Sequence, residues 1–406
     1  MVSCGRKGQS RLNLLIISPK FHPIIGGGET YVLNSAKRLH EFGWEISVAI
    51  EPNSKRNLKD YPFKVYELEG LSDSNLNVIN ATSSLNALIN QINPDLIHAH
   101  GYFALLAAGL CNLINIPILA LIHSTPVWGS RIIGGMDSFE AELDFARSVL
   151  DLSEPKLLTA ANAVYAEAAK KIAEGRVSVK VLPYPVDLDF FGQKSNVHLR
   201  RSMGLKNDDQ LIVVPSRVIR RKGIKEAILA LDLIPDNFYL CILGAVDPLD
   251  KNYWDEICSD SVFRKVRDRV IVPKQEMLYE DMPLLYGACN IIAMPSYYEG
   301  APVATVEAMA SGKAFVGADS QGINSFIRNE VNGLLVPQEN PVELAKAIKR
   351  LAEDPDLQKR LASQARKDIL YLSWSNQLPN LVKICEDIVH THHADFSRVA
   401  SMANEV

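Results

Sequence analysis

The 406-residue sequence has no large excess of charge and no paired cysteine motif. Its 43 Lys and Arg residues are balanced by 47 Asp and Glu residues, a formal net charge of −4. Nucleic-acid backbones are bound by concentrated basic surfaces, so this balance gives no reason to expect a nucleic-acid partner. The six cysteines are scattered, and those in apolar runs, such as Cys111 and Cys241, are typical of buried small hydrophobic residues. The pattern favours a reducing, cytoplasmic setting.

The sequence also has few long uncharged runs. One covers Phe103 to Ile122, but Pro117 divides it into a predicted helix, 104–113, and a predicted buried strand, 118–122. The apolar run 12–17 is too short for the core of a signal peptide. We therefore expect neither a membrane span nor a secretion signal.

Known phosphate and metal motifs are missing or incomplete. There is no G-x-x-x-x-G-K-[ST] loop, and the glycines at 26–28 lack the full G-x-G-x-x-G spacing, which makes a nicotinamide enzyme a distant alternative. Asp187-Leu188-Asp189 resembles a D-x-D metal motif, but it follows two prolines in LPYPVDLDFF, a segment without periodicity that is typical of a linker. The sequence thus predicts no metal and no cofactor.

Strands and helices alternate on both sides of this linker. Short apolar runs typical of buried parallel strands begin near residues 12, 45, 96 and 118, and again near 211, 238, 270, 290 and 314. This alternation predicts an α/β fold with two doubly wound, Rossmann-like domains facing a central cleft. We place the domains at 1–186 and 187–374, followed by a helix at 375–390 that returns toward the N-terminal domain and a loose tail at 391–406.

The segment PSYYEGAPVATVEAMASG follows a predicted strand and enters a helix near Pro302. Its loop and helix carry two carboxylates, Glu299 and Glu307. The helix N-terminus offers backbone N–H groups that favour an anion or electron-rich hydroxyls, at Gly300, Ala301 and Val303. A carboxylate beside them can accept two hydroxyl hydrogen bonds. On the residues alone, Glu299 as a helix cap and Glu307 as a solvated surface residue are equally consistent.

A second segment, PSRVIRRKG, follows the strand near 211. Arg217 and Lys222 flank its turn, and two cations at the carboxyl end of a strand suit a diphosphate. The alternative is a solvated basic turn. We assign no role to Arg220 or Arg221.

Together the two segments resemble the retaining glycosyltransferases of family four, which have the GT-B fold. The shared pattern is a pair of glutamates with seven residues between them, Glu299 and Glu307, downstream of an Arg…Lys-Gly turn, here Arg217 to Gly223. Further segments resemble the family's glycine loop with its helix and strand, its acceptor-side strand ends, its interdomain linker and the element after the donor site. They read GGGETYVLNSAKRLHEFGWEISV, DLIHAHGYFA with ALIHS, YPVDLDFF, and NGLLVPQENPVELAKAI.

The resemblance implies a hexosyltransferase-type enzyme that uses a nucleotide-diphosphate sugar as co-substrate and retains anomeric configuration. Glu307 would hold the ribose hydroxyls, and Arg217 and Lys222 the diphosphate. Glu299 would hold the transferred sugar, together with the backbone amides at Gly300, Ala301 and Val303. The catalytic set would be His123, Glu299, Arg217 and Lys222.

From the N-terminal domain, Gly27 and Gly28 would approach the diphosphate, and His123 matches the family histidine close to the reacting sugar. His98 and His100 lie on one face of their strand, and we take His100, nearer the loop, as the acceptor-side candidate. The acceptor would be a glycan, a lipid-linked sugar or a small molecule. The resemblance leaves open a peripheral contact with the inner membrane face.

Three positions depart from the family pattern, namely Ser124, Ser216 and Ser325. They leave the sugar and the acceptor undetermined. Two alternatives remain: a GT-B nucleotide-sugar epimerase or phosphorylase, and a non-catalytic nucleotide-sugar-binding homologue.

Overall fold

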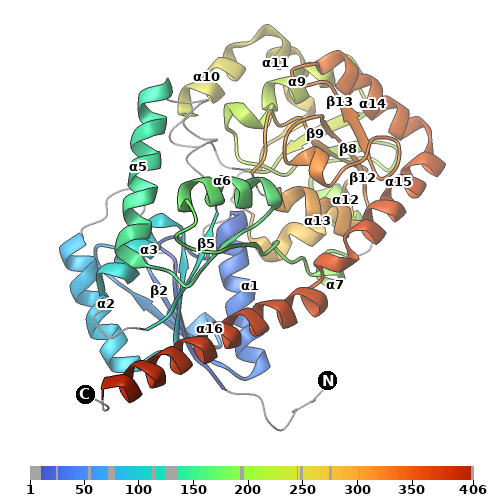
Figure 1. The fold of residues 1–406 in the computed structure, drawn as a ribbon. Helices are drawn as coiled ribbons and strands as arrows, with labels where there is room; N and C mark the ends of the chain where they lie inside the picture. Colours follow the sequence, from blue (N-terminus) through green and yellow to red (C-terminus); the bar gives the residue numbers. More distant parts are fainter. Residues whose placement is uncertain are drawn as a thin grey trace. The chain divides into compact units, whose positions relative to one another are not determined.

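The computed structural model describes residues 11–23, 26–53, 56–71, 78–111, 116–123, 135–192, 196–244, 246, 250–273, 277–300 and 302–403. The chain divides into two compact units (Figure 1). Unit 1 comprises Met1–Tyr184 and Ser375–Val406, and unit 2 comprises Pro185–Trp374. Among the described residues, no helix has the length and apolar character needed to cross a membrane.

Unit 1 is built on a seven-stranded sheet of order β3-β2-β1-β4-β5-β6-β7, in which every pairing is parallel. Its strands are β1 (Asn13–Ile17), β2 (Glu45–Ile50), β3 (Lys64–Glu67), β4 (Leu96–His100), β5 (Ile118–Ile122), β6 (Leu157–Ala160) and β7 (Val179–Val181). Its helices include α1 (Gly27–Phe42), α2 (Val78–Ile92), α3 (Tyr102–Cys111), α5 (Gly135–Ser153), α6 (Ala163–Ala173) and α16 (Trp374–Ala403).

Alternate residues of the unit 1 strands enter separate cores on the two faces of the sheet. Leu15 and Ile17 join a cluster with α2, α3 and α5. Leu14 and Ile16 join a cluster with α1 and α16. Because successive side chains of a strand point to opposite faces, an uninterrupted apolar run is what a sheet covered on both faces requires.

Unit 2 contains a six-stranded parallel sheet of order β10-β9-β8-β11-β12-β13. Its strands are β8 (Gln210–Val214), β9 (Phe238–Ile242), β10 (Val270–Ile271), β11 (Ile291–Met294), β12 (Ala314–Ala318) and β13 (Leu334–Val336). Its helices include α7 (Leu188–Phe191), α8 (Val197–Ser202), α9 (Ile224–Asp232), α10 (Lys251–Ser259), α11 (Ser261–Val266), α12 (Met282–Ala288), α13 (Val303–Ser311), α14 (Pro341–Glu353) and α15 (Pro355–Asp368). The predicted α/β class with two doubly wound domains is confirmed.

The expected loose tail is wrong for the part of it that the structure describes. Helix α16 continues through Ala403, beyond the predicted end at His390. Between the two positions the sequence has no proline or glycine that would end a helix. Val389 and His392 are buried, so the residues on both sides of the predicted end pack against the protein.

Candidate functional site

The predicted donor-side residues lie at the topological switch point of unit 2. Strands β8 and β11 are neighbours, and the chain proceeds outward from them in opposite directions, through β9 and β10 on one side and β12 and β13 on the other. Ligands of doubly wound sheets bind outside the carboxyl ends of the strands at such a point. Arg217 and Lys222 follow β8, and Glu299 follows β11.

Backbone contacts hold the loops after β8, β11 and β12 against one another. The amide of Tyr297 donates to the carbonyl of Arg221 at 2.8 Å, and the amide of Glu299 donates to the carbonyl of Gln321 at 2.8 Å. Gly223 and Gly322 have positive φ angles of 65° and 91°. A Cβ at either position would lie 2.1 Å from a neighbouring carbonyl oxygen, so these approaches require glycine.

Glu299 forms a buried ion pair across two of these loops. Its side chain is 6% exposed, and the Lys222 Nζ donates to its Oε1 at 2.5 Å. The Arg221 Nη1 lies 3.5 Å from Oε2 of the same carboxylate. The pair excludes the alternative reading of Lys222 as part of a solvated basic turn, and Glu299 is engaged with cations rather than acting as a helix cap.

Charge and burial act in opposite directions on this pair. Burial disfavours the charged carboxylate of Glu299, but Lys222, Arg221 and the hydrogen bonds from Lys222 and Ser296 outweigh it, so the pKa of Glu299 lies below its usual range. Burial lowers the pKa of Lys222, against the opposing effect of Glu299. We expect the pair to be ionised at neutral pH.

Glu307 occupies a different environment on α13. Its side chain is 7% exposed, which contradicts the alternative of a solvated surface residue. The Tyr286 hydroxyl donates to its Oε2 at 3.4 Å, a long hydrogen bond. Burial raises the pKa of Glu307 to about 8, and the hydrogen bond from Tyr286 only partly offsets this effect. We therefore expect the carboxyl group of the unliganded protein to be mostly protonated at neutral pH.

The other donor-side candidates of unit 2 belong to the same loops and to the start of α13. Arg217 is exposed, Gly300 is partly exposed, and Val303 is the first residue of α13. Ala301 lies outside the described residues.

The two arginines left without a role differ from each other. Arg220 pairs with the exposed Glu256 at 2.8 Å and stacks over the Tyr253 ring. Arg221 instead contacts Glu299 and stacks over the Tyr298 ring, 5.2 Å from its centroid. Sequence reasoning missed Arg221, since neither spacing nor composition distinguishes neighbouring arginines in a basic run.

The unit 1 candidates gather at the carboxyl ends of β4 and β5. His100 ends β4 and is buried, and its Nδ1 lies 3.0 Å from the Nε2 of His123, which follows β5. The other ring nitrogen of His123, Nδ1, is hydrogen-bonded to the Tyr184 hydroxyl. Gly27 is the first residue of α1, and a Cβ at Gly28 would lie 3.2 Å from the His123 Nδ1. The structure thus brings Gly28, His100 and His123 together.

All three histidines of this region are neutral at physiological pH. Burial lowers the pKa of His98 to about 3 and that of His123 to about 4, and the pKa of His100 also lies well below its ordinary value because it is buried. Tyr184 comes from the predicted linker, and sequence reasoning missed it because a tyrosine in an aperiodic segment indicates no partner.

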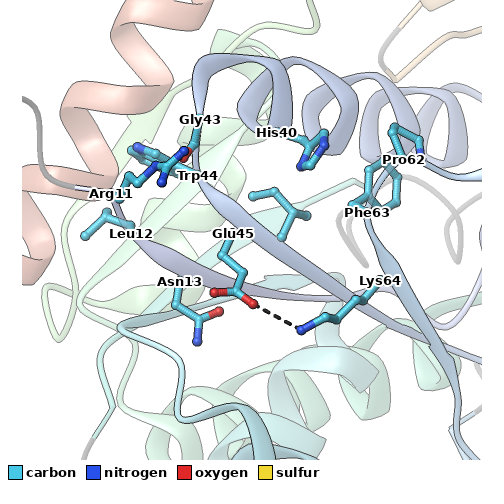
Figure 2. Close-up of a pocket in the computed structure, with 11 residues that line it drawn as sticks. Arg11, Leu12, Asn13, His40, Gly43, Trp44, Glu45, Pro62, Phe63 and Lys64 are labelled. Atoms are coloured by element: carbon cyan, nitrogen blue, oxygen red, sulfur yellow. Dashed lines mark hydrogen bonds and ion pairs between the residues drawn. The ribbon is translucent and has the colours of Figure 1, made fainter. Parts of the chain in front are cut away.

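A cavity of about 580 Å³ lies elsewhere in unit 1 (Figure 2). It is lined by the first residues of three strands, Asn13, Glu45 and Lys64, and so opens at the amino edge of the sheet. Figure 2 shows Glu45 and Lys64 facing each other, and their ion pair is 3.1 Å long. Both side chains are mostly exposed. None of the predicted site residues lines this cavity.

The residues described also account for the D-x-D motif. Asp187 is the N-cap of α7 and accepts hydrogen bonds from the amides of Asp189 and Phe190, which is a structural role. Within the described ranges, no group of three or more His, Cys, Asp or Glu side chains is arranged to hold a metal ion.

Two family models match the chain, "Glycosyltransferase Family 4" over residues 25–190 and "Glycosyl transferases group 1" over residues 197–368. An uncharacterised glycosyltransferase of Methanocaldococcus jannaschii is 26% identical over 308 residues, which are 73% of this chain and 76% of the relative. Sucrose-phosphate synthase from Thermosynechococcus elongatus superimposes with a TM-score of 0.81 at 21% identity, covering 94% of this chain and all of that structure. Anabaena HepE in complex with UDP-glucose gives a TM-score of 0.72 at 20% identity, covering 95% and 100%.

Proposed function

Since this chain belongs to the family 4, group 1 glycosyltransferases of GT-B fold, we propose that it transfers a hexosyl group from a nucleoside-diphosphate sugar to a hydroxyl acceptor with retention of anomeric configuration. The observation that carries the proposal is the buried Lys222–Glu299 ion pair at the switch point of unit 2. Burying two charges costs free energy. The binding of a charged, hydroxyl-rich ligand would explain why the two charges are buried here.

Fixed positive charge is what the leaving group of this reaction needs. Breaking the bond between the anomeric carbon and the diphosphate places negative charge on the leaving phosphate. Lys222 Nζ and the exposed Arg217 supply cations on the loop after β8, and Arg221 adds a third. Glu299 orients Lys222 before the donor arrives and offers a carboxylate to the sugar hydroxyls.

Glu307 is suited to bind the ribose of the donor. Its buried carboxyl group has one long hydrogen bond, from Tyr286, so it retains acceptor capacity for a pair of hydroxyl groups. The UDP-glucose complex of the structurally similar Anabaena protein supports a nucleotide-sugar donor. The roles of Gly27, Gly28, Gly300, Ala301 and Val303 toward the donor stay predictions, as do the acceptor and membrane contact.

The proposal is tested by a thermal-shift screen against UDP, GDP, ADP and their common sugar conjugates. A ligand at a hundred times its Kd adds about 2.7 kcal/mol to the free energy of unfolding. We expect one nucleotide and its sugar conjugates to raise the Tm of the wild type. The same compounds should leave the Tm of Arg217→Ala and Glu299→Gln unchanged. Arg220→Ala is the matched control, because Arg220 is an exposed arginine of the same run that pairs with Glu256.

Product analysis then separates the alternatives. Transfer of the sugar to an added acceptor, with the donor's anomeric configuration kept, supports the proposal. Epimer exchange or phosphate-dependent cleavage without an acceptor would favour an epimerase or phosphorylase. Binding without turnover would favour a non-catalytic homologue, and no binding by any nucleotide would refute the donor site.

A further inference from the structure

His123 is held by hydrogen bonds at both of its ring nitrogens. Nδ1 is bonded to the hydroxyl of Tyr184, and Nε2 lies 3.0 Å from Nδ1 of His100. Neither nitrogen is available to a substrate while these contacts last. The role of His123 in this chain therefore depends on Tyr184 and His100, and no sequence motif links these two residues.

Tyr184 is itself fixed in place by packing. It is buried, and its ring stacks on that of Tyr31 from α1, with the centroids 4.9 Å apart and the planes at 28°. Tyr31 also contacts the His100 ring at 5.8 Å. The His100 and His123 rings stack at 5.1 Å. The tyrosine hydroxyl is thus presented to His123 by a rigid buried cluster.

The two contacts of His123 allow two arrangements of the hydrogens. A neutral imidazole has one N–H donor and one acceptor nitrogen. Either His100 donates to Nε2 and Nδ1–H donates to the Tyr184 oxygen, or the Tyr184 hydroxyl donates to Nδ1 and Nε2–H donates to His100. In both arrangements Tyr184 and His100 together set the tautomer of His123.

We propose that Tyr184 is a positioning residue that, with His100, fixes the orientation and the tautomer of His123. The proposal rests on the proposed function, in which His123 lies close to the reacting sugar. In this arrangement the imidazole is a neutral, immobilised group. It accepts no proton from the acceptor hydroxyl, since both of its ring nitrogens are already engaged by His100 and Tyr184.

The test compares Tyr184→Phe with wild-type protein. The variant loses the hydroxyl and keeps the ring that stacks on Tyr31. Side-chain ¹H–¹⁵N correlation spectra of ¹⁵N-histidine-labelled protein, assigned with His123→Asn, report the tautomer of His123. We expect a single tautomer in the wild type and loss of that preference in Tyr184→Phe. We also expect kcat to fall by about 10²-fold, as for misplaced catalytic groups, with little change in the KM for the donor.

Tyr31→Phe is the control, because it removes a hydroxyl from the neighbouring ring of the same stack and leaves Tyr184 intact. It should preserve the His123 signal and kcat. An unchanged tautomer in Tyr184→Phe, or an altered tautomer with unchanged kcat, would overturn the inference. The tautomer could change in Tyr184→Phe while the wild-type protein transfers no sugar from any donor. That result would confirm the contact between Tyr184 and His123 but refute the proposed function, and with it the positioning role.

Discussion

Glu299 and Glu307 belong to one motif, yet their surroundings give them opposite protonation states at neutral pH. Glu299 has Lys222 and Arg221 within reach, and these cations overcome the effect of burial on its pKa. Glu307 is equally buried and has only the Tyr286 hydroxyl for a partner among the described residues, so its pKa is raised. Spacing predicted both positions, but it could not predict this difference, which depends on neighbours distant in the sequence.

Replacing Glu307 with glutamine should stabilise the unliganded protein at high pH. The carboxyl pKa is about 8 when folded and near its ordinary value of 4.5 when unfolded. The folded state therefore binds an extra proton between these values, and the free energy of unfolding falls as pH rises through the window. Glu307→Gln removes this penalty. Its Tm should exceed that of the wild type at pH 8.5 by at least about 3 °C, which roughly 1 kcal/mol produces, with a smaller difference at pH 5.

The same variant should lose its thermal response to the nucleotide, because the glutamine amide has one acceptor oxygen and cannot accept hydrogen bonds from a pair of ribose hydroxyls through two oxygens. The control is Glu353→Gln, which alters an exposed glutamate 3.7 Å from Lys349 and should shift Tm equally at both pH values. A Tm difference for Glu307→Gln that does not grow with pH would contradict a buried, protonated Glu307.

At the scale of elements, the sequence predicted most inner strands and the edge strand β10, but it missed the inner strand β6 and the edge strands β3, β7 and β13. The buried apolar runs of β1, β4, β5, β8, β11 and β12 are covered on both faces, so composition alone revealed them. The edge strands β3 and β7 contain exposed residues and gave no comparable signal. The contacts that lock the loops could not be predicted, since they join backbone groups that carry no sequence pattern.

Gly223 and Gly312 allow the loop contacts to be tested with matched backbone angles. Gly223 has φ 65° and ψ 32°, and Gly312 has φ 65° and ψ 30°. Alanine in this left-handed backbone conformation costs a similar free energy of about 1–2 kcal/mol at either position. Only at Gly223 would the Cβ also meet the Pro295 carbonyl oxygen, at 2.1 Å, whereas at Gly312 no described atom lies within 4 Å.

Gly223→Ala should therefore displace the loop that carries Glu299 and lower kcat/KM by about 10²-fold. Gly312→Ala should lower the Tm by a few degrees and keep kcat/KM within about twofold of the wild type, because its strain lies at the far end of α13. Steady-state kinetics and melting curves of both variants provide the comparison. Equal losses of kcat/KM in the two would mean that general strain, not loop packing, controls activity.

At the scale of the whole molecule, one unit is a continuous segment of the chain and the other is built from two segments. Unit 2 is one continuous segment, 185–374, whereas unit 1 needs the C-terminal residues from 375 onward. Helix α16 supplies Leu381, Val382 and Cys385 to the unit 1 core. The sequence analysis predicted a helix there that returns toward the N-terminal domain, but not which residues of it enter the core, since amphipathic periodicity does not identify individual contacts.

Unit 2 expressed as residues 185–374 should fold by itself and bind the nucleotide. Both faces of its sheet are covered by clusters drawn from unit 2 alone, and 190 residues is within the usual size of an independent domain. Arg217, Lys222, Glu299 and Glu307 all lie in it. We expect a single cooperative melting transition that the nucleotide identified with the full chain raises, with a Kd within about tenfold of the full-length value, a loss of roughly 1.4 kcal/mol. Sugar transfer should be absent, because His123 is in unit 1. If the isolated unit folds but gives no nucleotide response, binding requires groups of unit 1, and the glycines at positions 27 and 28 become the first residues to replace.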